Sequence, residues 1–447
     1  MRILLLIAFR NLVQARRRTI LLSIALALVT LLLVLLLALS QGLQDTMIRN
    51  VTSQLTGHVN VAGFYKLKAK DAIPMVTHAA AARRIVEENT QDVDYIVMRL
   101  RGWGKMISDV ASIQVAIHGL TAAEEGHFLG SVQLAKESDY KEGGRDEALG
   151  DPGKLSQPET AMIFEGQAKR LGITVGDKVS VTVETEQGQA NVLDMTIVAV
   201  AKSSGFMSNF SLYIPNETVS KLYNLSPDAT GAVMIYLKDI ARANDVMYQL
   251  VDVFKRKGYD IMDHDSKPFW DKFERVMGED WTGQKLDLTT WKDEASWLQW
   301  ILRAFESVSF VLVTILTVII AIGIMNAMWI AVRERTREIG TIRAIGLSRK
   351  GVMALFMLEA ALLGLIATTL GGIAGALMAY GIDQAQIRIT VDAVKMMLMS
   401  DTLHLSVHWF HIVEAAAAFT LVSCLATIWP AARAAFLQPV KAIQSIG

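Results

Sequence analysis

Long apolar runs near both ends of the chain, with a mixed polar and apolar stretch between them, dominate the sequence pattern. Four runs carry almost no charged side chains. About 20 apolar residues in an α-helix cross the hydrocarbon core of a bilayer, and buried helices of soluble proteins rarely run this long without charge. The pattern therefore predicts a membrane protein with four transmembrane α-helices, at 19–40, within 297–332 (a stalk followed by the apolar run 308–332), at 352–382 and at 412–432.

The first run, Ile20–Leu39, follows a basic segment, and a secretory signal peptide begins in the same way. The run is longer than the apolar region of a signal peptide, and no convincing cleavage motif precedes Gln41. We therefore expect an uncleaved helix. In residues 1–18, one helical face can hold Ile3, Leu4, Ile7 and Leu12-Val13, and the other face can hold Arg10, Asn11 and Gln14. This pattern favours an amphipathic interfacial helix over an irregular polar lead-in.

Charge distribution sets the expected orientation. Basic residues cluster before the first run, between the second and third, and after the fourth, whereas residues 383–411 have few. Because basic loops stay in the cytoplasm, we expect both termini, the loop 333–351 and the tail 433–447 to be cytoplasmic. Residues 41–296 and the short loop 383–411 should then lie outside.

The stretch 41–296 has the patterns of a folded domain. Strict alternation at Val179, Val181 and Val183 predicts a half-buried strand. Further strands are expected at 192–200, 232–237 and 259–262, with a helix at 242–257, and these would form one α+β lobe. A helix at 78–89 and strands at 93–98 and 113–118 would form a second lobe. The polar segment 137–158 is expected to be a loop between the lobes.

Two of the predicted spans carry packing signals. Trp297, Trp300, Ile301 and Phe305 follow one stripe of a helix that begins before the second span, which predicts a stalk with tryptophans near the interface. In the third span, small residues recur every four positions, which predicts a close helix contact, inside the subunit or across a dimer. These are Ala367, Gly371, Gly375 and Ala379.

Composition and motifs exclude several functions. The formal net charge is zero, so nothing indicates nucleic acid as a partner. The sequence has no phosphate-binding G-x-x-x-x-G-K-[ST], no H-E-x-x-H and no G-x-S-x-G. His404 and His408 have the spacing of metal ligands on a helix, but no full ligand set accompanies them. We therefore expect neither an enzyme nor a cofactor or metal in this chain.

Loop 333–351 reads RERTREIGTIRAIGLSRKG, a short mixed-charge helix followed by a glycine and a second basic cluster. Its first residues would extend the second span beyond Val332. Ile339, Ile342 and Ile345 would offer apolar contacts to a partner. The alternative is a solvated basic anchor without a partner.

This loop closely resembles that of the FtsX/MacB/LolC–LolE family of ABC transporter permeases. The matching positions are Asn326, Val332, Glu334 to Gly340, Arg343 to Gly346, and Glu359. Both ends also resemble the family, at Arg10 to Leu12, Arg16 to Thr19, Pro430 to Ala435, Pro439-Val440 and Ala442-Ile443. A weaker resemblance lies in the outer domain, at Ala168 to Leu171 and Gly176 to Val179.

The resemblance implies a permease dimer, built with a second copy or a paralogue, in the bacterial inner membrane. Cytoplasmic ATPase subunits would bind the loop, and ATP and Mg²⁺ would belong to them; fused members carry their ATPase at the N-terminus, whereas this chain starts at its first helix. The coupling residues it implies are Glu334, Arg335, Arg337, Glu338, Arg343 and Gly346.

Three activities remain open under this resemblance. The first is release of lipoprotein or lipid from the membrane, with a periplasmic carrier protein. The second is MacB-like efflux or export with a periplasmic adaptor. The third is FtsX-like signalling to a cell-wall hydrolase, for which the outer domain is larger than usual.

Overall fold

The computed structural model describes residues 2–438, except 70, 186–187, 204, 392–393, 396–397, 399 and 401. The motif positions Pro439-Val440 and Ala442-Ile443 lie outside the described residues. The chain divides into two compact units. We call them the helical unit (Met1–Asp45, Ile301–Arg388 and Thr402–Gly447) and the inserted domain (Thr46–Trp300 with Ile389–Asp401).

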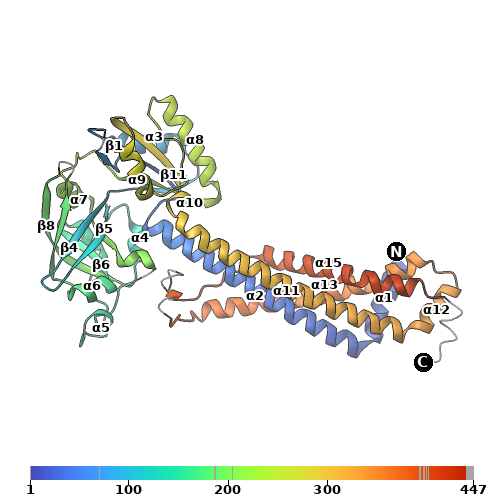
Figure 1. Cartoon of the computed structure of the whole chain (residues 1–447). Helices are drawn as coiled ribbons and strands as arrows, with labels where there is room; N and C mark the ends of the chain where they lie inside the picture. The colour runs from blue at the N-terminus through green and yellow to red at the C-terminus, as the bar shows by residue number, and fades with distance from the viewer. Residues whose placement is uncertain are drawn as a thin grey trace. The chain divides into compact units, whose positions relative to one another are not determined.

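Helices make up the helical unit, and Figure 1 shows the long ones side by side. Among the described residues, four helices are long and apolar enough to cross a membrane, which confirms the prediction of four spans. The helices are α1 (Arg2–Gln14), α2 (Arg16–Gln54), α11 (Ser296–Glu334), α12 (Thr336–Ala344), α13 (Arg349–Gln384) and α15 (Trp409–Ala435).

Two helix ends differ from the sequence-based boundaries. Helix α2 does not stop at residue 40 but continues without a break to Gln54. Helix α15 passes through Pro430 and ends at Ala435, three residues beyond the predicted end of the fourth span. Both α2 and α11 are longer than a membrane requires.

Helix α13 is the most covered of the four long helices. Half of its most apolar window is buried, against 11% for α11. Its N-terminus is capped by Ser348, whose hydroxyl accepts from the Gly351 N–H at 3.1 Å. The apolar core around it joins all four long helices, through residues such as Leu33, Ile324, Ala367 and Phe419.

The inserted domain contains a sheet lobe and a barrel lobe. The sheet has the antiparallel order β11-β1-β10-β3, with β2 paired to β1. Its strands are β1 (Val59–Lys66), β2 (Ala72–Ile73), β3 (Val93–Arg99), β10 (Ala232–Leu237) and β11 (Gly283–Thr290). One apolar core joins the sheet to α3 (Ala79–Asn89) and α8 (Ala243–Arg256), and a smaller one joins it to α9 (Phe269–Gly278).

The barrel lobe is a closed barrel of order β4-β5-β9-β6-β8-β7, with β4 pairing β7 to close it. Its strands are β4 (Arg101–Ile107), β5 (Ser112–Leu120), β6 (Thr160–Phe164), β7 (Lys178–Glu184), β8 (Ala190–Ala201) and β9 (Ser211–Pro215). The accompanying short helices are α4 (Gly126–Ser131), α5 (Glu137–Tyr140), α6 (Glu165–Leu171) and α7 (Asn216–Tyr223), while α10 (Trp291–Glu294) follows β11.

The structure corrects how the expected strands group into lobes. Strand 93–99 belongs with 232–237 in the sheet, whereas 112–120 joins 178–184 in the barrel. Segment 137–158 is not a loop between lobes: it belongs to the barrel lobe, where Tyr140 and Leu155 are buried in its cores. Near 259–262 the described residues form only one bridge, between Ile261 and Leu286.

The last turn of α2 is held inside the inserted domain by polar side chains. The Arg99 guanidinium donates to the Ser53 and Gln54 carbonyls, each at 2.9 Å, and is also paired with Glu125 at 2.6 Å. The Tyr213 hydroxyl donates to the Gln54 carbonyl at 3.1 Å. These bonds satisfy carbonyls that a helix C-terminus leaves without internal partners.

Candidate coupling site

The helix of the second span stops at Glu334, and a separate helix, α12, follows it. Arg335 between them has φ −110° and ψ 20°, outside the α-helical range. The Thr336 hydroxyl donates back to the Val332 and Arg333 carbonyls at 3.0 Å, an interaction that competes with regular helix bonding. The sequence predicts that the second span continues as one helix beyond Val332. Instead, α11 ends at Glu334 and α12 begins at Thr336.

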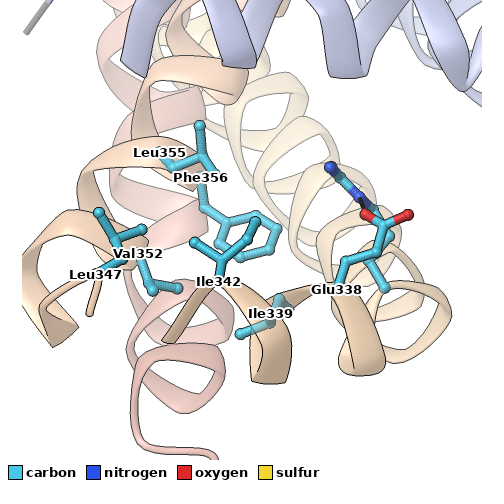
Figure 2. Close-up of a pocket in the computed structure, with 8 residues that line it drawn as sticks. Glu338, Ile339, Ile342, Leu347, Val352, Leu355 and Phe356 are labelled. Carbon is cyan, nitrogen blue, oxygen red and sulfur yellow. Dashed lines mark hydrogen bonds and ion pairs between the residues drawn. The ribbon is translucent and has the colours of Figure 1, made fainter. Parts of the chain in front are cut away.

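The apolar face of α12 packs on α13. Ile339 is buried and Ile342 is half-buried, against Val352 and Phe356 of α13. Figure 2 shows these side chains pointing toward one another around a small gap. The gap measures about 10 Å³, room for about one water molecule, so it is packing space and not a ligand site.

The opposite face of α12 is charged and exposed. Arg337 is exposed there. Glu338 is exposed at the edge of the gap, which it lines, and Glu334, the last residue of α11, is exposed as well. Ile345, just after α12, is 82% exposed. Of the three isoleucines expected to face a partner, Ile339 is buried and Ile342 half-buried within the chain, while Ile345 is presented outward. The exposed surface is thus an apolar tip beside mixed charges.

A buried polar cluster holds the start of α12 in place. Glu359 of α13 is 2% exposed, and its Oε1 accepts from Asn11 Nδ2 at 2.5 Å and from Arg335 Nη1 at 3.1 Å. Arg335 also donates to Glu338 at 2.8 Å. Burial lowers the pKa of Arg335, but its bonds to Glu338 and Glu359 outweigh this and raise it overall. The cluster joins α1, α12 and α13.

The cluster also revises the expected face of α1. The sequence places Asn11 on the polar side, yet Asn11 and Ala8 are buried while Ile3 and Leu6 are exposed. The sequence marked Asn11 in one motif and Arg335 and Glu359 in another, but neither motif predicts that the three side chains meet. Their convergence is visible only in the fold.

Two predicted coupling residues have local roles. Arg343 donates through Nη1 to the Leu437 carbonyl, so it ties the end of α12 to the segment after α15. Gly346 has φ +110°, a conformation that favours glycine, and a Cβ there would meet no atom within 4 Å. Gly346 therefore shapes the turn between α12 and α13.

The small-residue seam of α13 packs within the subunit, against α2. Ala367, Gly371, Gly375 and Ala379 are all buried. A Cβ on Gly371 would lie 2.7 Å from the Ala27 Cα, and one on Gly375 would lie 3.0 Å from the Leu31 carbonyl oxygen. The two helix backbones thus approach closely at this face.

The expected tryptophan stripe is only partly the packed face at the start of α11. Ile301 is buried and Phe305 is half-buried, but Trp300 is 61% exposed. Leu298, which the stripe omitted, is fully buried. Trp297 is half-buried and lines a cavity in the inserted domain.

The two histidines of the metal spacing do not share a helix, because both precede α15. His404 Nε2 lies 3.0 Å from the Thr402 hydroxyl, and His408 Nε2 lies 3.2 Å from the Ser406 hydroxyl. Within the described residues, no group of three potential metal ligands converges.

Comparisons with known proteins match both units of this architecture. Residues 310–439 match the family described as FtsX-like permease C-terminal, and residues 19–253 match the MacB-like periplasmic core domain. The chain belongs to the family of FtsX-like permeases with a MacB-like periplasmic core domain. With its four candidate spans, it is a multi-pass membrane protein with a large α/β domain between the first two spans.

Individual relatives come from two branches. The chain is 35% identical over 126 residues to the macrolide export ATP-binding/permease protein MacB of Bordetella avium, covering 28% of this chain and 17% of the relative. It is 24% identical over 291 residues to the lipoprotein-releasing system transmembrane protein LolC of Neisseria meningitidis, covering 62% of this chain and 63% of the relative. The chain thus spans about a sixth of that MacB and under two thirds of that LolC.

A solved structure is also similar, the periplasmic region of MacB from Actinobacillus actinomycetemcomitans. The match has 10% identity and a TM-score of 0.31, and it covers 54% of this chain and 92% of the other.

Proposed function

We propose that this chain is the permease subunit of an ABC transporter and that α12 is the element which cytoplasmic ATPase subunits bind. The observation that carries the proposal is the division of α12 into two faces. Its apolar face and the Asn11–Glu359–Arg335 cluster fix it to the helical unit. Its other face leaves Arg337, Glu338 and the neighbouring Ile345 exposed to a partner.

Continuous helices support a mechanical role for this contact. Helix α11 runs from Ser296, in the inserted domain, to Glu334, one residue before the break that begins α12. Helix α2 likewise enters the inserted domain without interruption. Movement of α12, driven by ATP hydrolysis on the partner, would pass along these helices to the inserted domain.

The proposed orientation follows the basic residues. Both termini and the α12 region would lie in the cytoplasm of a bacterial inner-membrane protein, with the inserted domain in the periplasm. Because Cys424 is the only cysteine, a Cys424→Ser background allows the test. Exposed Thr341 and Ser226 would each be changed to Cys and exposed to an impermeant maleimide. We expect Ser226→Cys to be labelled in intact spheroplasts and Thr341→Cys only after lysis; the reverse pattern would contradict the orientation.

We propose release of lipoprotein or lipid from the membrane as the first candidate activity. The LolC similarity covers 62% of this chain and 63% of that relative, whereas two matches to MacB proteins cover 28% and 57% of this chain but only 17% and 33% of those relatives. Export with a periplasmic adaptor is the second candidate, favoured by the match of residues 19–253 to the MacB-like core domain. A co-purifying acylated protein would favour the first, and a co-purifying adaptor the second.

Charge reversal in α12 tests the coupling. Arg337→Glu and Glu338→Arg should each abolish stimulation of the partner ATPase in proteoliposomes while leaving membrane insertion intact. The matched control is Glu274→Arg, at an exposed position of α9 in the inserted domain. Normal stimulation by both α12 variants would remove the basis of the proposal, as would an equal loss in the control.

A further inference from the structure

The inserted domain contains a cavity of about 470 Å³, a volume typical of sites for one small organic molecule. Strands β4 and β5 of the barrel, the start of α9 and the first turn of α11 contribute to it. Its walls are mostly aromatic and apolar, with Trp103, Phe210, Phe269 and Trp270 among them. Leu55, directly after α2, also lines it.

Three polar groups in this wall are buried without a hydrogen-bond partner among the described residues. They are Arg101 Nη2, His118 Nε2 and Trp297 Nε1. Buried polar atoms in proteins are nearly always paired, so three orphans in one cavity indicate a partner that comes from outside the chain. An arginine and an indole nitrogen only donate hydrogen bonds, so that partner must present an acceptor.

The charges around the cavity define the acceptor further. The Arg101 side chain is 4% exposed, and its Nη1 forms an ion pair with Glu294 Oε2 at 3.8 Å, too long for a hydrogen bond. Its guanidinium lies over the Phe269 ring, 4.8 Å from the ring centroid. Burial, together with the charges of Arg99 and Arg101, lowers the pKa of His118 to about 3. His118 is therefore neutral at physiological pH and adds no positive charge. One guanidinium beside two neutral groups suits a single carboxylate or ester better than a polyanion.

We propose that this cavity binds one amphiphilic molecule, an acyl chain with a carboxylate or ester head. The chain lies against the aromatic wall, and the head oxygen accepts from Arg101, His118 and Trp297. Such walls exclude sugars and nucleotides, because they would leave the many polar groups of those ligands without partners. Binding itself does not depend on the proposed transport function; only the role of the ligand as cargo or regulator rests on it.

The cavity also connects a ligand to the two long helices. Leu55 follows the last residue of α2, and Trp297 lies in the first turn of α11. A ligand held by Trp297 and packed on Leu55 would therefore contact both helix ends. A bound ligand in that position could therefore shift the ends of α2 and α11, the helices that we propose to transmit movement.

The test uses the full chain purified in detergent, without its ATPase, so that a failure of binding is distinct from a failure of coupling. The probe is palmitic acid carrying a chain diazirine, with peptide mapping of the photolabelled sites. We expect labelling of cavity residues such as Met207 and Trp103. Hexadecyltrimethylammonium, with the same chain length but a cationic head, should not compete.

Substitutions test separately the apolar cavity wall and the polar contacts to the ligand head group. Ala116→Leu places extra carbons in the cavity, and its matched control is Ala81→Leu on the exposed face of α3. Arg101→Met and Trp297→Phe keep side-chain bulk and remove donors. We expect Ala116→Leu to abolish labelling and Arg101→Met to weaken binding at least roughly tenfold, the loss of one hydrogen bond to a charged group.

Because Arg101 is buried, each variant must first match the melting temperature of the parent protein. If Arg101→Met fails to fold, Trp297→Phe, at a half-buried position, tests the same loss of a hydrogen-bond donor to the ligand. Equal labelling of Ala116→Leu and the parent, or full competition by the cationic amphiphile, would overturn the proposal. Mass spectrometry of molecules that co-purify with the chain distinguishes a free fatty acid, a membrane phospholipid and a protein-bound acyl group as the natural source.

Discussion

Removing the Glu359 carboxylate is the most direct test of how the chain holds α12. Glu359→Leu replaces the carboxylate with an apolar side chain of similar size, which leaves Asn11 and Arg335 without their shared acceptor. A hydrogen bond to a charged group contributes about 1.5–3 kcal/mol, and breaking a buried ion pair from one side costs about 3–5 kcal/mol. Arg335 keeps its bond to Glu338 and is 18% exposed. We therefore expect a loss of about 2–4 kcal/mol.

The measurement is reversible unfolding in mixed micelles with increasing sodium dodecyl sulfate, for four proteins. These are the parent, Glu359→Leu, Arg335→Met and the double variant. If the two groups stabilise each other, the double variant should lose less than the sum of the two single losses, by about 1–3 kcal/mol. Glu359→Gln, which keeps an acceptor for Asn11 but no charge for Arg335, should fall between the parent and Glu359→Leu.

Strict additivity of the two single changes would refute the reasoning, because residues that do not interact have independent effects. ATPase stimulation distinguishes residues that hold α12 in the chain from residues that contact the partner ATPase. Glu359→Leu should reduce ATPase stimulation through loss of α12 placement, whereas Ile345→Asp should reduce it without changing unfolding, since Ile345 is exposed. Unchanged stimulation in Glu359→Leu would show that the cluster does not place α12 for its partner.

Three further outcomes follow from contacts in the two units. Gly371→Ala should destabilise by about 1–3 kcal/mol, because its Cβ meets the α2 backbone, whereas Gly381→Ala, which meets no atom within 4 Å, should not; both are measured by the same unfolding assay. Arg99→Met leaves Glu125 buried and unpaired, so limited proteolysis after α2 should accelerate. The pKa of His118 is lowered to about 3, so below about pH 6.5 the unfolded chain binds a proton at this residue more readily than the folded chain does. The folded state is therefore destabilised relative to the unfolded state as the pH falls from 6.5. His118→Gln should make the melting temperature depend less on pH between pH 6.5 and 4.

Local patterns in the sequence predict local structure well in this chain. Apolar run length identifies the four long helices, and alternation identifies strand β7. The four-residue spacing of small side chains identifies the packed face of α13. Spacing cannot name the partner helix, however, and only the structure shows that Gly371 and Gly375 meet α2.

Non-local pairing is where the sequence was insufficient. Strand β3 pairs with β10, while its direct continuation β4 joins the barrel, so neighbouring residues belong to different lobes. Alternation reports which face of a strand is buried but not which strand lies beside it. The same limit applies to Arg101, His118 and Trp297, which come from separate elements and form one cavity wall.

Buried charged side chains anchor the long helices in both units of this chain. Arg99 and Tyr213 hold the last carbonyls of α2, and Arg335 bonds Glu359 one residue after α11 ends. Apolar packing alone would let a helix slide or rotate, because one apolar contact replaces another at little cost, whereas a buried hydrogen-bonded charge has few alternative partners. Under the proposed function, a helix can pass displacement only if its ends stay fixed to what they move. Uncoupling variants that preserve assembly should therefore concentrate at these two anchors and be rare along the apolar faces between them.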